Sequence, residues 1–308
     1  MILITEFMDE DAVECLRRDY DVRYDPDLAA AQERIPALAA GARALIVRNQ
    51  TKVTAALLDA APDLACVGRL GVSLDNIDLA VCEARGIAVY PATGANNLSV
   101  AEYVIGNAML LLRSAYSVNA AILAGDWPRG VCGKGRELAG KMLGLVGYGA
   151  IARETAEKAR ALGMTIAAFD PYLPAGDPAW RGTRNLPFEA LLAEADVVSL
   201  HVPLTEETRH LIDAERLALM KPDAILINAA RGGVVDEAAL AEALAAGRLG
   251  GAALDVFETE PLSREAAARF AGLSNLVLTP HIAGVTQESN VRVSAMTARA
   301  VADHLARH

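Results

Sequence analysis

The sequence predicts an α/β protein with two doubly wound domains, each built on a parallel β-sheet. Its 308 residues are enough for two domains of ordinary size. Short runs rich in β-branched residues alternate with helical patterns throughout, and these runs are apolar at consecutive positions. Continuous apolar strands between helices are typical of a parallel sheet that is covered on both faces. The two halves of the chain repeat this architecture.

The first alternating unit extends to about residue 97. Its strands are expected near residues 2–7, 44–49, 64–71 and 87–91, with helices over residues 9–20, 51–62 and 76–86 between them. The last helix of the chain, over residues 287–306, is expected to pack back onto this unit. The first domain is therefore predicted to comprise residues 1–97 and 285–308.

The second domain is expected over residues 98–284. It opens with a long, almost uniformly apolar helix from about Ser99 to Leu123, which should be buried between domains or between subunits. This helix predicts a homodimer built through the second domain. After a glycine-rich loop, strands are expected near residues 142–147, 165–170, 197–202, 224–230, 251–257 and 276–282.

Composition narrows the classes of partner. The net charge is −10 and no basic run is present, which argues against nucleic acid and against an anionic membrane surface. The first residues lack the basic region of a signal peptide, and the longest apolar stretch is too short to span a bilayer. The four cysteines form no CxxC pair and have no metal-ligand spacing with the five histidines. We therefore expect a cytoplasmic protein with reduced thiols and no metal.

A dinucleotide-binding motif follows the first strand of the second domain. Gly147 and Gly149 allow a tight turn and the close approach of a pyrophosphate, and Ala152 is small enough for helix–strand packing. The helix that follows offers free N–H groups to the phosphates. Asp170 ends the next strand, 18 residues beyond Ala152, close to the ~20 expected for a carboxylate that binds a ribose. No arginine follows until Arg181, so NAD is favoured over NADP.

Three later strands end in polar residues within apolar surroundings. Arg231 follows one strand, Asp255 and Glu260 follow the next, and His281 follows the last. Taken singly, each is most simply a structural or solvated residue. Because ligands bind beyond the carboxyl ends of the strands in open α/β sheets, all four are expected to reach one edge.

These residue types suit hydride transfer between a 2-hydroxy acid and a 2-oxo acid. An arginine holds the planar carboxylate and polarises the adjacent carbonyl group. A histidine gives or takes the hydroxyl proton. A carboxylate that is hydrogen-bonded to the other imidazole nitrogen orients the ring and raises its pKa.

The sequence resembles the D-isomer-specific 2-hydroxyacid dehydrogenases nearly from end to end. The matching stretches are VRNQTKV, GRLGVSLDNID, TGANNLSVAEY, GLVGYGAIA, HVPLTEETRHLI, INAARGGVVDEAAL, DVFETEPL and TPHIAG. The resemblance implies a flavodoxin-like substrate domain and a Rossmann NAD-binding domain. It also implies that Arg231 binds substrate, that His281 is the acid/base with Glu260 as its partner, and that Asp255 contacts the nicotinamide carboxamide.

Further site residues follow from the same resemblance. The cofactor residues it implies are Gly147, Gly149, Ala150, Ile151, Asp170, His201, Val202, Pro203, Thr208, Ala229, Ala230, Arg231, Asp255, His281 and Gly284. The substrate residues it implies are Arg48, Arg69, Leu70, Gly71, Val72, Asn96, Arg231 and His281. Two departures from the family pattern are mild, because Ala152 and Ser73 each replace a common glycine and neither removes a reacting group.

Charge near the site is the only guide to the substrate. Arg48, Arg69 and Arg129 match positions that surround the phosphate in the phosphoglycerate members, although each can equally be structural or exposed. If they converge, the substrate carries a second anionic group, as 3-phosphoglycerate and 3-sulfolactate do. The stretches ITEFMDEDAV and PATGANNLSVAEYVIGNAMLLLR resemble the sulfolactate dehydrogenase branch.

Other readings stay open at this point. Hydroxypyruvate or glyoxylate is an alternative substrate. A non-catalytic protein that senses NAD(H) by binding it is an alternative from another class. A formate dehydrogenase is disfavoured, since that branch pairs its histidine with glutamine and Glu260 is an acid.

Overall fold

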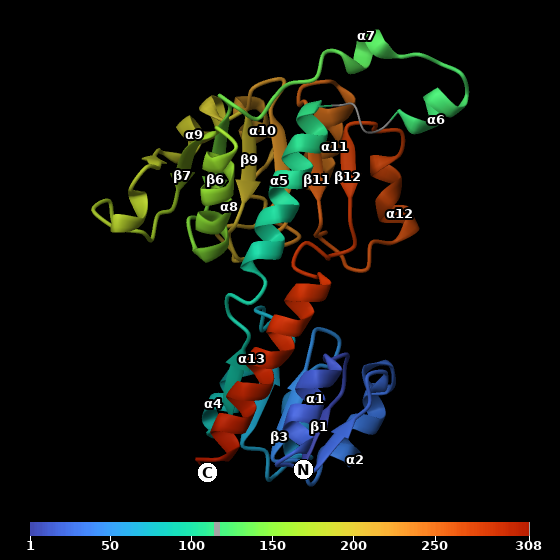
Figure 1. The fold of residues 1–308 in the computed structure, drawn as a ribbon, viewed down its shortest axis with the longest axis vertical. Helices are drawn as coiled ribbons and strands as arrows, with labels where there is room; N and C mark the ends of the chain where they lie inside the picture. The colour runs from blue at the N-terminus through green and yellow to red at the C-terminus, as the bar shows by residue number, and fades with distance from the viewer. Residues whose placement is uncertain (114–117, 308) are drawn as a thin grey trace. The chain divides into compact units, whose positions relative to one another are not determined.

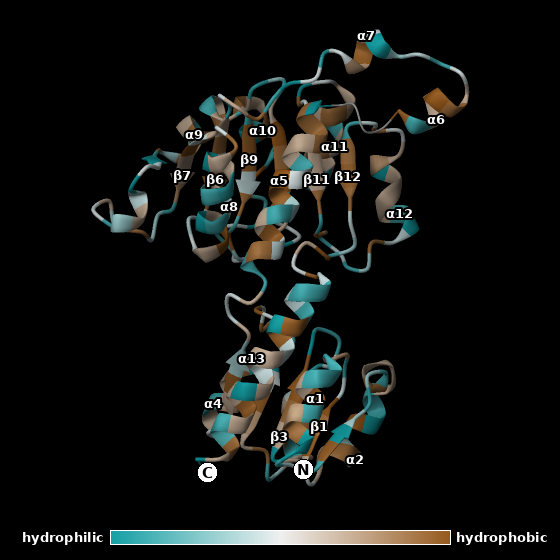
Figure 2. Ribbon diagram, in the orientation of Figure 1, coloured by the Kyte–Doolittle hydropathy of each residue, from teal (hydrophilic) through white to brown (hydrophobic). Residues whose placement is uncertain are grey.

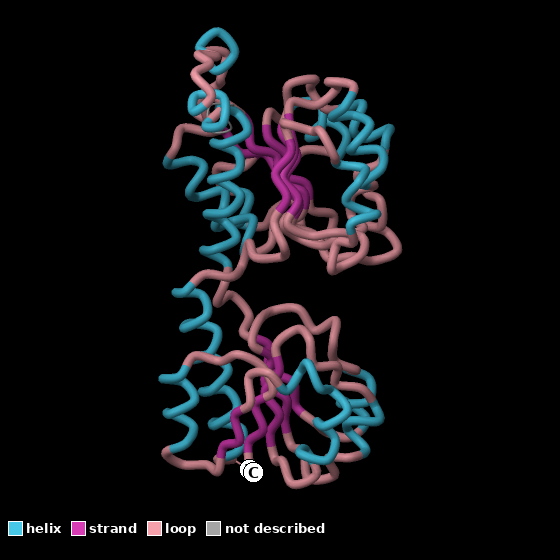
Figure 3. Tube along the Cα trace, turned by 90° about the vertical axis from the view of Figure 1, so that its right-hand side faces the viewer, coloured by secondary structure: helices cyan, strands magenta, loops and turns pink. Residues whose placement is uncertain are grey.

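The computed structural model describes residues 1–113 and 118–307, which form two compact units. The first unit contains residues 1–96 and 285–308, and the second contains residues 97–284. In each unit a parallel sheet lies between two layers of helices (Figure 3), which confirms the predicted fold class.

Within the described residues, the first unit has a five-stranded parallel sheet in the order β2-β1-β3-β4-β5, the flavodoxin-like order. The strands are β1 (Ile2–Ile4), β2 (Val22–Tyr24), β3 (Ala44–Val47), β4 (Cys66–Arg69) and β5 (Ala88–Pro91). One face of the sheet is covered by α1 (Glu10–Arg17) and α13 (Gln287–Leu305). The other face is covered by the 3₁₀ turn η1 (Leu28–Arg34), α2 (Ile35–Ala39), α3 (Ala55–Asp59) and α4 (Leu79–Ala84).

The described part of the second unit has a seven-stranded parallel sheet in the order β12-β11-β10-β9-β6-β7-β8. The strands are β6 (Met142–Val146), β7 (Thr165–Phe169), β8 (Arg184–Asn185), β9 (Val197–Leu200), β10 (Ile225–Asn228), β11 (Gly251–Leu254) and β12 (Leu276–Leu278). Counted from β6, the first six strands have the order 3-2-1-4-5-6 of a Rossmann sheet.

Helices cover both faces of this second sheet (Figure 1). The long helix α5 (Asn97–Arg113) and α8 (Ala150–Ala161) pack on one face. The other face is covered by α9 (Phe188–Glu194), α10 (Ala214–Leu219) and α11 (Glu237–Ala245). The unit also contains two 3₁₀ turns, η2 (Pro178–Trp180) and η3 (Ala268–Phe270), and the short α12 (Arg264–Ala267). In Figure 2 the strands are mostly brown, because parallel strands are buried on both faces.

The prediction of one continuous helix from about Ser99 to Leu123 is wrong at the C-terminal end of that helix. The helix α5 ends at Arg113, residues 114–117 lie outside the described residues, and a separate helix α6 (Asn119–Leu123) follows. Val118, with φ −104° and ψ 6°, precedes α6 and is not helical. The apolar side chains of α6 are not buried within the unit, so packing does not extend α5 through them.

The segment from α6 to α7 (Arg129–Cys132) forms an arm that extends away from the second sheet (Figure 1). No helix in residues 1–113 or 118–307 is long and apolar enough to cross a membrane.

Candidate active site

The glycine turn after β6 has the backbone that the motif requires. Gly147 has φ +86°, and a Cβ there would lie 2.6 Å from the carbonyl oxygen of His201. Gly149 is the N-cap of α8, and no described atom lies within 4 Å of the place where its Cβ would be. Ala152 is fully buried against the sheet, so a small residue is required there. The turn thus leaves open space in front of backbone N–H groups at the start of a twelve-residue helix, which fits a pyrophosphate.

Asp170 lies beside this turn at the end of β7. One of its carboxylate oxygens accepts a hydrogen bond from the N–H of Tyr148 at 2.8 Å, and the other accepts one from Tyr172 at 3.0 Å. These bonds orient the carboxylate and leave lone pairs on both oxygens. The donor set therefore fits an adenosine ribose, whose hydroxyl groups can donate to Asp170.

Strand β9, which pairs with β6 in the sheet, leads into the loop that carries four more of the expected cofactor residues. His201 Nε2 lies 3.0 Å from the hydroxyl of Ser199, and burial lowers the pKa of His201 to about 4, so the ring is neutral. Val202 follows directly. The hydroxyl of Thr208 donates to the carbonyl oxygen of Pro203 at 2.6 Å and closes the loop.

Arg231 lies in a turn that is fixed by the strand before it. The amide of Asn228, the last residue of β10, accepts from the N–H of Ala230 at 3.1 Å and donates to the carbonyl oxygen of Arg231 at 2.9 Å. Gly232 follows, and a Cβ there would collide with the backbone of Phe257. The turn that carries Arg231 and the loop that carries Glu260 are therefore in direct backbone contact.

Asp255 anchors the turn that carries His281. Its buried carboxylate accepts from the hydroxyl of Thr279 at 2.6 Å and from the N–H groups of Ile282 and Ala283 at 2.8 and 2.7 Å. Its carbonyl oxygen accepts from the N–H of His281 at 2.8 Å. His281 has φ +56°, which non-glycine residues rarely adopt unless the surrounding structure holds them there.

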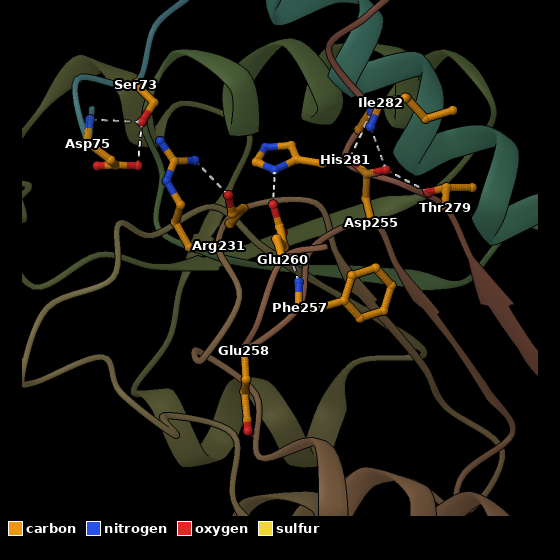
Figure 4. Close-up of polar contacts among 12 residues, drawn as sticks. Ser73, Asp75, Arg231, Asp255, Phe257, Glu258, Glu260, Thr279, His281 and Ile282 are labelled. Carbon is orange, nitrogen blue, oxygen red and sulfur yellow. Dashed lines mark hydrogen bonds and ion pairs between the residues drawn. The ribbon is translucent and has the colours of Figure 1, made fainter. Parts of the chain in front are cut away.

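His281 and Glu260 form a direct pair (Figure 4). The imidazole Nδ1 lies 2.7 Å from Oε2 of Glu260, while Oε1 accepts from the N–H of Phe257 at 3.0 Å. Among the described residues the pair thus brings together two loops of the second unit, and it assigns Nε2 as the nitrogen that can exchange a proton with a ligand.

The electrostatics of the pair match this geometry. The hydrogen bond to Glu260 raises the pKa of His281 above its ordinary value of 6.5, against the effect of burial. Burial by itself raises the pKa of Glu260, but the hydrogen bonds from His281 and Phe257, with the charges of His281 and Arg231, bring it below its usual value. The pair therefore favours a charged imidazolium beside a carboxylate near neutral pH.

In the first unit, Arg48 and Arg69 lie at the same edge of the sheet. Val47 is the partner of Arg69 in the register of β3 and β4, and Arg48 follows Val47 directly. A guanidinium nitrogen of Arg69 donates to the carbonyl oxygen of Leu70 at 3.0 Å. Gly71 has φ +145°, and a Cβ there would collide with that guanidinium, so the expected substrate loop needs its glycine.

Arg48 is fixed by its neighbours. Its guanidinium donates to Asn290 at 2.9 Å and lies 6.0 Å from the centre of the Phe7 ring. The buried carboxylate of Glu6 accepts from the four successive N–H groups of residues 48–51 at 2.8–3.2 Å. Glu6 was not expected from the sequence, since one acid at a strand end has no distinctive pattern.

The remaining residues expected to bind substrate are Asn96, Val72 and Arg129. The side-chain oxygen of Asn96 is buried and has no hydrogen-bond partner among the described residues. Val72 and Ser73 follow Gly71, and the Ser73 hydroxyl donates to Asp75. Arg129 is exposed on α7 of the second unit, so its convergence with the arginines of the first unit stays a prediction.

Tyr103 is a site residue that the sequence did not reveal. Its hydroxyl lies 2.7 Å from that of Thr279, which in turn donates to Asp255. Burial raises the pKa of Tyr103 to about 12. The residue therefore links α5 to the anchor of the His281 turn.

No group of histidine, cysteine and carboxylate side chains in residues 1–113 and 118–307 could hold a metal ion.

Comparison with known proteins identifies the class. Residues 105–283 match the family model described as "D-isomer specific 2-hydroxyacid dehydrogenase, NAD binding domain". The chain belongs to this family. It is therefore an NAD-dependent oxidoreductase, and NAD is the cofactor that the glycine turn and Asp170 fit.

Individual relatives agree with this. The chain is 54% identical to the (S)-sulfolactate dehydrogenase of Chromohalobacter salexigens over 297 residues, which cover 96% of this chain and 95% of that protein. It is 42% identical to the hydroxypyruvate reductase of Thermotoga maritima, over 81% of this chain and 80% of that protein. It is 37% identical to the D-3-phosphoglycerate dehydrogenase of Archaeoglobus fulgidus, over 96% of this chain but 56% of that longer protein.

Solved structures show the same fold. The D-lactate dehydrogenase of Aquifex aeolicus, complexed with NAD and lactic acid, has a TM-score of 0.84 at 29% identity, with 100% of this chain and 96% of that chain covered. The TT0316 protein of Thermus thermophilus has a TM-score of 0.90 at 33% identity, with 100% and 97% covered.

Proposed function

We propose that the protein interconverts 3-sulfolactate and its 2-oxo acid, with His281, Glu260 and Arg231 as the catalytic residues. The observation that carries the catalytic assignment is the 2.7 Å contact between His281 and Glu260 at the carboxyl edge of the second sheet. The 54% identity to a sulfolactate dehydrogenase over nearly the whole chain supports the substrate.

NAD, held by the glycine turn at Gly147 and Gly149 and by Asp170, would supply the hydride acceptor for C2 of the hydroxy acid, or the hydride donor for the oxo acid. The guanidinium of Arg231 binds the substrate carboxylate and polarises the C2 oxygen. Nε2 of His281 takes the hydroxyl proton during oxidation and gives it back during reduction. Glu260 holds Nδ1, so it fixes the orientation of the ring and stabilises the imidazolium.

The (S) descriptor in the name of the relative is compatible with a D-isomer-specific family. In lactate the carboxyl group outranks the methyl group, and the D isomer is (R). In sulfolactate the carbon that bears sulfur outranks the carboxyl group, because sulfur has a higher atomic number than oxygen. This inverts the descriptor without moving an atom. An (S)-sulfolactate therefore presents its hydrogen, hydroxyl and carboxylate as a D-2-hydroxy acid does.

The common sheet edge of Arg48 and Arg69 supports a substrate with a second anion. A guanidinium binds the oxygens of a sulfonate or a phosphate. We assign these two arginines to the sulfonate, and the backbone of Leu70 to Val72, with Asn96, to the substrate carboxylate. In this proposal residues 1–97 and 285–308 are the substrate domain and residues 98–284 are the NAD-binding domain.

The expected cofactor residues keep their roles in this proposal. Ala150 and Ile151, which open α8, would hold the pyrophosphate, and Val202, Pro203 and Thr208 would line the adenosine. Ala229, Ala230 and Gly284 would complete the nicotinamide side together with Asp255. The order of the strand ends in the second sheet supports these places.

We further infer a homodimer assembled through the arm. Leu123, Trp127 and Val131 are 88%, 78% and 71% exposed, which is unusual for large apolar side chains on one short segment. A second copy of the chain would cover them. Analytical ultracentrifugation of the protein and of a Leu123→Asp variant tests this, and a wild-type monomer at micromolar concentration would refute it.

All four cysteines are free thiols, which supports a cytoplasmic location.

A substrate screen tests the proposed activity. NADH oxidation is followed with 3-sulfopyruvate, phosphohydroxypyruvate, hydroxypyruvate and glyoxylate. We expect the highest kcat/KM with 3-sulfopyruvate. A higher value with hydroxypyruvate or glyoxylate would replace the substrate but keep the chemistry. Turnover with none of them, while NADH still binds, would favour a protein that senses NAD(H).

A further inference from the structure

A buried glutamate outside the catalytic set holds the loop that carries Glu260. Glu237 is the first residue of α11, and its side chain is only 4% exposed. Its Oε1 accepts from the N–H of Glu258 at 2.6 Å, and its own N–H donates to the carboxylate of Glu258 at 3.3 Å. The start of α11 and the loop thus exchange two hydrogen bonds. Glu237 is not needed as a helix cap, since the side chain of Asp236 already accepts from the N–H groups of Ala238 and Ala239.

The contact lies two residues before Glu260 in the chain. The N–H of Phe257 donates to Glu260, and the next N–H along the chain, that of Glu258, donates to Glu237. In Figure 4 the side chain of Glu258 points away from His281, while Glu260 points toward it. Two successive peptide groups are therefore held by carboxylates, one of them catalytic and one of them buried behind the loop.

Burying the Glu237 carboxylate disfavours its charged form, and neighbouring groups partly offset this cost. Burial raises the pKa of Glu237, and the charges of Glu258 and Asp236 act in the same direction. The hydrogen bond from the Glu258 N–H opposes them, as does Arg269, whose guanidinium lies 3.6 Å from Oε2. His210 faces the other partner, with Nε2 3.2 Å from the carboxylate of Glu258. A carboxylate buried at such a cost is stable only while its hydrogen bonds are made.

We propose that Glu237 is a positioning residue for the acid/base pair: it fixes the loop at Glu258 and thereby the orientation of Glu260 toward His281. The inference rests on the proposed roles of Glu260 and His281. Glu237 acts through the peptide group of Glu258 and not on the substrate. A displacement of about 1 Å at a catalytic group can lower a rate by roughly 100-fold, so the anchor matters for turnover.

Three substitutions distinguish the effect of losing the hydrogen bond from Glu258 from the effects of changing the charge or the size of the side chain. Glu237→Gln keeps an oxygen that can accept from Glu258 and removes the charge. Glu237→Met keeps the length of the side chain and removes the acceptor. Glu237→Asp keeps the charge but withdraws it by about 1.5 Å, the length of one C–C bond. Glu242→Met, at an exposed position of the same helix, is the matched control.

The readouts are the pH profile of kcat/KM for reduction, together with Tm and NADH affinity. With Met and Asp we expect kcat to fall roughly 10- to 100-fold and the apparent pKa of the profile to move toward ~6.5, while NADH affinity stays the same. Gln should restore most of the rate and the wild-type profile, and Glu242→Met should change neither. A purely structural role would lower Tm in the Met and Asp variants without moving the profile.

The outcomes distinguish this inference from the proposed function. If the profile and kcat of a folded Asp or Met variant match those of the wild type, the positioning role of Glu237 is overturned. Should Met not fold, Asp decides, because it keeps the buried charge. If His281→Asn retains near-normal turnover, the acid/base assignment itself fails, whatever the Glu237 variants do.

Discussion

Nδ1 of His281 and Oε2 of Glu260 lie 2.7 Å apart, and the two residues come from loops that follow different strands of one parallel sheet. The sheet order makes this contact, since β11 and β12 are neighbours and end at the same edge. The consequences of this contact, and of the residues that support it, can be measured.

The first prediction concerns pH. Reduction needs a protonated His281, whose pKa is raised above 6.5 mainly by the hydrogen bond to Glu260. Because a group with a raised pKa keeps its proton to higher pH, kcat/KM for the oxo acid should be constant below that pKa and fall above it. Oxidation of the hydroxy acid should show the opposite limb. In Glu260→Gln both limbs should move to lower pH. Identical profiles for Glu260→Gln and the wild type would remove Glu260 from the mechanism.

A second prediction concerns Arg231. Arg231→Lys keeps the charge but loses the planar pair of donors that a carboxylate accepts. Hydrogen bonds to charged groups contribute about 1.5–3 kcal/mol, so KM for the oxo acid should rise roughly 10- to 100-fold. Affinity for NADH, measured by fluorescence titration, should remain within about twofold. An unchanged KM would show that Arg231 does not bind the substrate.

The third prediction concerns cofactor choice. Asp170→Asn keeps an oxygen that can accept from the N–H of Tyr148 but removes the charge that repels a 2′-phosphate. Hydrogen bonds from the ribose hydroxyls of NADH to a charged carboxylate contribute about 1.5–3 kcal/mol, and the variant loses this contribution. The ratio of kcat/KM for NADPH to that for NADH should therefore rise roughly 10- to 100-fold. Steady-state kinetics with both cofactors provide the check, with Tm as the control for folding. A ratio that does not move would contradict the ribose contact.

The fourth prediction concerns Asp255. Asp255→Asn turns an amide NH₂ group toward hydrogen-bond donors, since the carboxylate accepts from Thr279, Ile282 and Ala283. A buried unsatisfied donor costs about 1–3 kcal/mol, so the free energy of unfolding should fall by that amount, and kcat should fall because the His281 turn loosens. Urea denaturation and kinetics measure the two effects. A variant as stable as the wild type would show that the turn is anchored elsewhere.

Much of this structure could be predicted from the sequence. The consecutive apolar runs identified the parallel strands, and the rule that ligands bind at the carboxyl ends of strands led to Arg231, Glu260 and His281. The strands β2 and β8 were not expected. They are short edge strands whose residues are only partly buried or exposed, so no apolar run marks them.

The supporting residues could not be predicted for a different reason. Tyr103 meets Thr279 across 176 positions of the chain, and Glu237 meets Glu258 across 21. Neither contact has a local pattern, because each depends on how the helices pack and not on spacing along one element. The end of α5 was overestimated because apolar side chains on an exposed arm resemble the buried face of a longer helix.

The φ of +56° at His281 affects how any inactive variant at this position should be read. Alanine rarely adopts the left-handed backbone conformation. His281→Ala therefore removes the imidazole and also favours a different backbone conformation at this position. Asparagine is among the residues found several times more often than most in that region. In His281→Asn, therefore, lost activity can be attributed to the missing imidazole and not to the backbone. The difference between this variant and His281→Ala would measure how much the left-handed backbone contributes.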